Sequence, residues 1–204
     1  IAADPKVNLA FYTRVLGLRF IKKSVNQDDP GTYHLYYGDN VGSPGTALTF
    51  FPWVGLRRGR PGTGQAYATA FSVPAGALGF WQARLHALNV PTFALQTRFG
   101  ETVLPVADPD GMRLELVFTQ EADLRQPAPS PDVPADVAIR GFHSSTLALA
   151  TAAPTAALLT DLMGYRLVAS ETHRDRYATA DGGPGTYVDL LTGPDLPRGL
   201  NGAG

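Results

Sequence analysis

Apolar and polar positions along the chain repeat one arrangement three times: a helical stretch, a short turn and a strand. Asp4 is a good N-cap for the first helix, and Pro5 suits its first helical position. Gly17 supplies the left-handed residue that ends this helix. The spacing predicts that the buried face of the helix consists of Val7, Ala10, Phe11 and Val15.

The other two copies keep this pattern. The third, residues 154–164, closes on Gly164, whereas the second, residues 78–90, has Asn89, which also tolerates the left-handed conformation. Strand patterns are predicted at residues 67–73 and 142–149 before these helices, and after the three helices at 18–25, 33–37, 46–53, 92–98, 102–107, 112–118, 165–171, 176–180 and 186–191. Turn sequences rich in Asp, Pro and Gly separate them, at 28–31, 42–45, 108–111 and 181–185.

Each unit therefore reads strand, helix, strand, strand, strand. Because one unit cannot bury both faces of its sheet alone, we expect an α+β fold of βαβββ modules that pair into curved, barrel-like mixed β-sheets. The predicted divisions are a first module at 1–54 with a truncated first strand, a second at 66–119, a Pro-rich linker at 120–137, a third module at 138–192, and at 193–204 the start of a linker to a missing fourth module.

Composition narrows the class of protein. The 204 residues are 44% hydrophobic and 17% charged with a formal net charge of −1, which fits a globular protein and argues against a nucleic-acid or membrane surface. The chain has no cysteine, which excludes thiolate chemistry and favours the cytoplasm. The first residue is Ile1 and the last residues carry no charge, so we expect both ends to be cuts within a longer protein.

Residues 22–39 and 42–53 closely resemble the hydroquinone-type ring-cleaving dioxygenases of the vicinal-oxygen-chelate (glyoxalase, bleomycin resistance and dioxygenase) superfamily. The resemblance covers essentially the whole chain, and the turn 108–111 leading to Glu115 is a weaker, general mark of the superfamily. It implies a chain of four βαβββ modules that cleaves a hydroquinone- or catechol-like small aromatic with O₂. It also implies an Fe(II) or Mn(II) ion held by two His and one Glu, the facial triad that leaves positions open for substrate and O₂.

The same resemblance places one His ligand on the first strand of the first module and the other His and the Glu in the fourth. We therefore expect all three ligands to lie outside residues 1–204, and this stretch alone to be inactive. Without its partner the first module would leave strand edges exposed, which favours a homodimer.

An alignment of the modules with one another indicates what stands at the equivalent positions inside the chain. The ligating position on the first strand holds Ala68 in the second module and Ser144 in the third, and neither is a useful ligand for these ions. The carboxylate position on the last strand holds Glu115 in the second module and Asp189, or a neighbour, in the third. Paired modules would thus form a degenerate site, where we expect no tight metal.

Two alternatives follow for this second site. In one, His143 and Glu115 bind a metal. In the other, His143 donates a hydrogen bond at the barrel mouth and Glu115 pairs with Arg113 or Arg98. His86 and His173 are predicted to be solvated.

The first module offers a different pair of groups. Alternation puts His34 and Tyr36 on one face of the strand 33–37, and Thr49, at the vacant Glu position, should point the same way. These residues are the candidate pocket lining, where a His and a Tyr would orient a phenolic substrate or relay a proton. The alternative is a satisfied core pair.

Two other function classes stay open on this fold. One is a metal-dependent lyase or isomerase of the glyoxalase kind, which needs two carboxylates and is disfavoured by Thr49. The other is a non-catalytic small-molecule-binding protein of the bleomycin-resistance kind.

Overall fold

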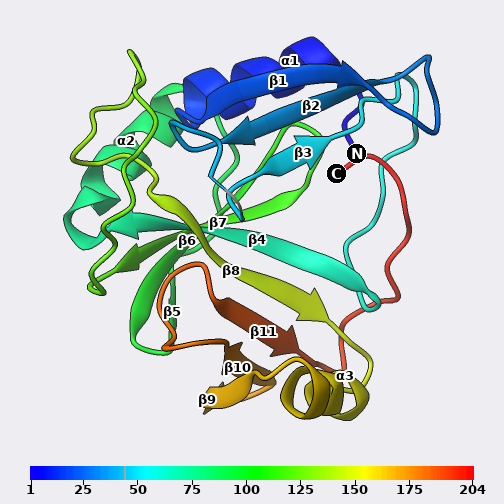
Figure 1. The fold of residues 1–204 in the computed structure, drawn as a ribbon, viewed down its shortest axis with the longest axis vertical. Helices are drawn as coiled ribbons and strands as arrows, with labels where there is room; N and C mark the ends of the chain where they lie inside the picture. Colours follow the sequence, from blue (N-terminus) through cyan, green and yellow to red (C-terminus); the bar gives the residue numbers. More distant parts are fainter. Residues whose placement is uncertain (44) are drawn as a thin grey trace.

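The computed structural model describes residues 1–43 and 45–204, so Pro44 of the predicted turn 42–45 lies outside the described residues. The second and third repeats form one eight-stranded sheet (Figure 1). Its strands lie in the order β5-β6-β7-β4-β8-β11-β10-β9. The strand bounds are β4 Gln65–Pro74, β5 Gln96–Arg98, β6 Glu101–Ala107, β7 Arg113–Thr119, β8 Gly141–Ala148, β9 Arg166–Glu171, β10 Arg174–Ala178 and β11 Tyr187–Leu191.

The first repeat forms a separate three-stranded sheet above it in Figure 1, with the order β1-β2-β3. The strand bounds are β1 Arg19–Val25, β2 Tyr33–Gly38 and β3 Leu48–Phe50. Ala2, ahead of the helix, makes a parallel bridge to Pro52, just beyond β3. The helices are α1 Pro5–Ala10, α2 Leu78–Ala87 and α3 Ala153–Ala157, and π-helical turns extend α1 over Phe11–Val15 and α3 over Leu158–Leu162.

All three repeats share one strand order. In the second, β4 pairs in parallel with β7, and in the third, β8 pairs in parallel with β11. The bridge from Ala2 to Pro52 is the same parallel pairing in the first repeat. The predicted fold class is confirmed.

The second and third repeats join where β4 runs antiparallel to β8. Ala68 pairs with Thr146 and Ala70 with Ser144, so a local two-fold axis exchanges Ala68 with Ser144. Each strand carries one extra residue beside this pairing, Tyr67 in β4 and His143 in β8, and such a bulge redirects a side chain. These bulges fall at the positions that the alignment of the modules made equivalent.

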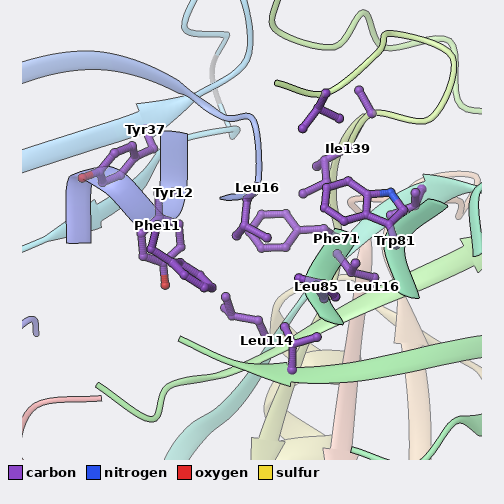
Figure 2. Packing of buried hydrophobic residues seen from close by; sticks show 14 of the residues in the cluster. Phe11, Tyr12, Leu16, Tyr37, Phe71, Trp81, Leu85, Leu114, Leu116 and Ile139 are labelled. Atoms are coloured by element: carbon purple, nitrogen blue, oxygen red, sulfur yellow. The ribbon is translucent and has the colours of Figure 1, made fainter. Parts of the chain in front are cut away.

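The main hydrophobic core lies between the two sheets. Phe11, Tyr12 and Leu16 pack from the first repeat toward Phe71, and Trp81 of α2 covers the same side of the large sheet (Figure 2). The contact is tied by the Tyr12 hydroxyl, which donates to Asp108 Oδ2 at 3.0 Å. A smaller core of Leu159, Tyr177 and Leu190 lies in the third repeat.

The first helix begins and ends where the sequence predicts. The Asp4 carboxylate accepts from the backbone N–H groups of Lys6 and Val7, and Gly17 has φ +74°. Its predicted buried face is wrong in part, because Val7 and Ala10 are exposed. The polar Asn8 is buried instead, since its Oδ1 accepts a hydrogen bond of 2.8 Å from the Tyr37 hydroxyl.

Two connections are more ordered than their composition suggests. Val133, in the Pro-rich stretch 120–137, is buried in the main core and lies against Gly17. The segment after β11 pairs with the connection between the first two repeats, since Arg60 and Leu200 exchange backbone hydrogen bonds of 2.9 Å. This pairing brings Gly204 to Ile1 (Figure 1).

The predicted strand 92–98 is shorter than expected: only Gln96–Arg98 pairs continuously, and Thr92 makes an isolated bridge. Among the described residues, no helix combines the length and apolar character that crossing a membrane requires.

Gly17 and Gly164 form a matched pair for a stability test. Both have positive φ, but a Cβ on Gly17 would meet Val133 Cγ2 at 2.9 Å, whereas nothing lies within 4 Å of a Cβ on Gly164. Gly164→Ala should lower the free energy of unfolding by about 1 kcal/mol through backbone strain alone. Gly17→Ala should cost about 2 kcal/mol or more, because Val133 must also move. Equal losses in urea unfolding would contradict the Val133 contact.

Candidate functional site

The small sheet has one covered face and one free face. Leu35 and Tyr37 of β2 point toward α1 and are buried. His34 and Tyr36 alternate with them and occupy the opposite face, where Thr49 pairs with Tyr36 across β2 and β3. The three candidate pocket residues therefore lie on one face, as alternation predicts, and all are half-buried.

His34 is held in one orientation on this free face. Its Nδ1 lies 2.7 Å from the Tyr36 hydroxyl oxygen, and its ring lies 4.0 Å between centroids from both Tyr36 and Phe51. Its Nε2 is buried and has no hydrogen-bond partner among the described residues. This nitrogen has an unused hydrogen-bonding capacity, as donor or acceptor depending on the tautomer, but it is covered by neighbouring atoms.

Two effects lower the pKa of His34. Burial comes first, because it disfavours the charged imidazolium, and the charge of Lys22 adds to it. Lys22 lies opposite Tyr36 in the β1–β2 pairing, and its Nζ is 5.6 Å from the Tyr36 ring centroid. The neutral imidazole is therefore favoured further toward acid pH than in a free His.

Aromatic side chains continue along the same face. Phe51 follows β3, and its ring centroid is 5.8 Å from that of Trp53. Trp53 Nε1 donates to Asp29 Oδ2 at 2.8 Å, which fixes the indole. Together with His34 and Tyr36 these rings make an aromatic surface with one neutral, directional polar group, suited to a planar phenolic molecule.

The residues of the second predicted site lie on the inner face of the large sheet. Ala70 pairs with Glu115 on one side and with Ser144 on the other, so the three share one row. Ala68 lies one row away, opposite Thr146. By the local two-fold axis Asp189 is the equivalent of Glu115, since it pairs with Thr146 as Glu115 pairs with Ala70.

A network of buried charges lies on this inner face. Arg98 Nη1 lies 2.7 Å from Glu115 Oε2. Arg176 contacts Asp189 through Nε at 2.8 Å and Glu101 through Nη1 at 2.8 Å. Because β6 and β10 lie far apart in the strand order, the contact of Arg176 with Glu101 shows that the sheet curls across its inner face.

His143 belongs to this network. Its ring is fully buried, and Nε2 lies 3.1 Å from Glu101 Oε1 while Nδ1 lies 3.2 Å from Ser144 Oγ. Burial opposes ionisation of Glu101, but His143 and Arg176 outweigh it and lower the pKa of Glu101 to about 2. His143 is thus a buried partner of a carboxylate and does not lie at an open mouth.

The described residues do not fit the triad of two His and one Glu. No group of three or more His, Cys, Asp and Glu side chains there is arranged to hold a metal ion. At the second site the two carboxylates face the guanidinium groups of Arg98, Arg174 and Arg176. The pair of Glu115 with Arg98 is the second of the two alternatives weighed from the sequence.

His86 and His173 are exposed, as predicted. Arg174, Arg176 and Glu101 were not among the site residues predicted from the sequence. A signal was present, since two arginines two positions apart on a strand point to the same face. The residues that this face contacts depend on how the sheet curls, and the local sequence does not show that curvature.

Comparisons with known proteins cover the whole chain. It is 45% identical over 204 residues to "Putative ring-cleaving dioxygenase MhqO" of Bacillus subtilis and spans 64% of that protein. It is 34% identical over 211 aligned residues to MhqA of the same organism, which has the same description, and spans 67% of it. It is also 32% identical over 185 residues, 89% of this chain, to a chlorohydroquinone/hydroquinone 1,2-dioxygenase of Sphingobium indicum, of which it covers 58%. No family model matches.

Solved structures agree. A crystal structure of a Bacillus subtilis protein described as a dioxygenase superposes with a TM-score of 0.91 at 44% identity, over 100% of this chain and 64% of that one. Glyoxalase I of Zea mays superposes with a TM-score of 0.72 at 14% identity, over 98% of this chain and 68% of that one, which shows a shared fold only. The chain therefore belongs to the ring-cleaving dioxygenase family, and it shares the fold of glyoxalase I.

Proposed function

We propose that the protein is a ring-cleaving dioxygenase of extradiol type that acts on hydroquinone- or catechol-like aromatics with O₂, and that the free face of the small sheet forms one wall of its substrate pocket. The observation that carries the second part is His34, whose buried Nε2 has no hydrogen-bond partner among the described residues while Nδ1 is fixed by Tyr36. The first part is supported by the relatives, all named as ring-cleaving or hydroquinone dioxygenases.

In this proposal the side chains that cover His34 Nε2 move when substrate binds, and Nε2 then accepts or donates a hydrogen bond at a substrate hydroxyl. Tyr36 is a positioning residue, because it fixes the imidazole through Nδ1. Phe51 and Trp53 supply the flat surface on which an aromatic ring stacks. A neutral imidazole in this place is able to take a phenolic proton, which a permanently charged group cannot do.

The bound ion would supply a common binding point for substrate and O₂. The described residues do not form its ligand set, and the chain spans 64% of the length of MhqO. We propose that Fe(II) or Mn(II) is held by chain that the longer relatives have beyond the matched region.

The rival activity on this fold is an isomerase or lyase of the glyoxalase kind. O₂ uptake with hydroquinone, measured beside isomerisation of a thiohemiacetal, separates the two. We expect O₂ uptake alone, using the protein at the full length of its relatives with Fe(II) or Mn(II) supplied. Isomerisation without O₂ uptake would overturn the proposed activity.

His34→Gln should lower kcat/KM for hydroquinone about 100-fold, because general acid–base groups contribute at this level. Tyr36→Phe should lower it less, since it only loosens the imidazole. His86→Gln is the matched control, because His86 is exposed on α2, and it should keep full activity.

The following result would contradict the proposed role of His34. If His34→Gln keeps the activity of the unchanged protein while His86→Gln behaves the same, the free face is a structural surface. Thermal unfolding of each variant separates loss of fold from loss of function.

The environment of His34 should show in its pKa. In an NMR titration it should lie below the ordinary value of about 6.5, because burial and Lys22 both disfavour the charged ring. Lys22→Gln removes only the charge and should raise this pKa part of the way toward 6.5. An unchanged pKa in Lys22→Gln would show that Lys22 does not act on His34.

A further inference from the structure

The inner face of the large sheet contains a cavity of about 250 Å³, separate from the free face of the small sheet. Its wall includes the charged side chains of Arg98, Arg113, Glu115 and Arg174. Tyr67 and Phe93 add two aromatic rings to the same wall. For scale, a dry cavity of about 150 Å³ accommodates benzene, so a ring with one substituent fits here.

Positive charge exceeds negative charge around this cavity. Among the described residues that line it, Glu115 is the one carboxylate, and it is already paired with Arg98. Arg174 shares its partner, because the carboxylate of Asp189 forms an ion pair with Arg176 as well. The pKa of Arg174 is lowered. Burial is the largest cause, and the positive charge of Arg98 is the second.

Some N–H groups of these arginines have no hydrogen-bond acceptor among the described residues and could bind a ligand. Arg174 uses Nη1 for Thr146 and Asp189, and its Nε and Nη2 make no hydrogen bond among the described residues. Neither atom is sealed from the cavity, unlike the buried unpartnered atoms elsewhere. Arg113 takes part in no ion pair among the described residues, and its guanidinium lies 4.6 Å from the Tyr67 ring centroid and 5.9 Å from that of Phe93.

We propose that this cavity is a second small-molecule site, which binds a planar, ring-sized carboxylate. The guanidinium groups of Arg113 and Arg174 would receive the carboxylate, because a planar fork of N–H donors matches its two oxygens. Tyr67 and Phe93 would pack against the ring. The site does not depend on the proposed substrate wall, because its lining comes from β4, β5, β6, β7, β10 and β11 of the other sheet and from Phe93.

Calorimetric titration of the protein with benzoate at neutral pH tests this, with benzamide as the neutral ligand of the same shape. Benzoate should bind saturably, and benzamide at least tenfold more weakly, because it lacks the charge that strengthens the hydrogen bonds. Inorganic phosphate should also bind more weakly, since it has no ring. Phosphate of equal or higher affinity would overturn the assignment of a ring-sized carboxylate.

Two variants should move the affinity in opposite directions. Arg113→Met should weaken benzoate binding about tenfold or more, because one charge-assisted contact is lost. Glu115→Gln should strengthen it, because Arg98 is released and the one negative charge of the wall is removed. Arg14→Met, an exposed arginine of the first repeat, is the control and should change nothing.

Several outcomes would overturn the second site. They are no saturable benzoate binding, equal affinity for benzamide, unchanged affinity in Arg113→Met, or weaker binding in Glu115→Gln. If Arg113→Met does not fold, Arg113→Lys replaces it. Lysine keeps the charge without the fork, so it should still weaken binding, and unchanged affinity would again contradict the proposal.

Discussion

The antiparallel pairing of β4 with β8 is the constraint on which the rest of the structure depends. It joins two repeats that each leave one strand edge open, and it sets their register through Ala68 with Thr146 and Ala70 with Ser144. Because side chains alternate along a strand, this register decides which residues face inward. Glu115 and Asp189 point inward as equivalents, and Phe71 points outward into the main core.

The inner face then needs positive charge. Buried carboxylates are costly unless they are paired, and Glu101, Glu115 and Asp189 are all buried or nearly so. In this sheet the positive charge that pairs with these carboxylates is carried by the side chains of Arg98, Arg174 and Arg176. The small sheet is arranged differently, because its free face carries aromatic rings and a neutral His34. The two sheets share one strand order and have different surface chemistry, which is why we assign them different ligands.

Periodicity and turn chemistry were sufficient to predict the fold. The caps at Asp4 and Gly17, the shared strand order and the face shared by His34, Tyr36 and Thr49 follow from local rules, and the structure has them. The burial of Asn8 was missed, because its partner Tyr37 lies far along the chain. The packing of Val133 on Gly17 was missed because a Pro-rich stretch indicates a linker whether or not it is buried. The roles of the candidate site residues stay predictions.

Hydrogen exchange in the native state tests the joining of the two repeats most directly. Amides of β4 and β8 should exchange with one common free energy of opening, the highest in the chain, because neither strand can open without the other. If amides at the centre of β8 exchanged at a much lower free energy than those of β4, the third repeat would open by itself. That result would contradict a single eight-stranded sheet as the basis of the structure.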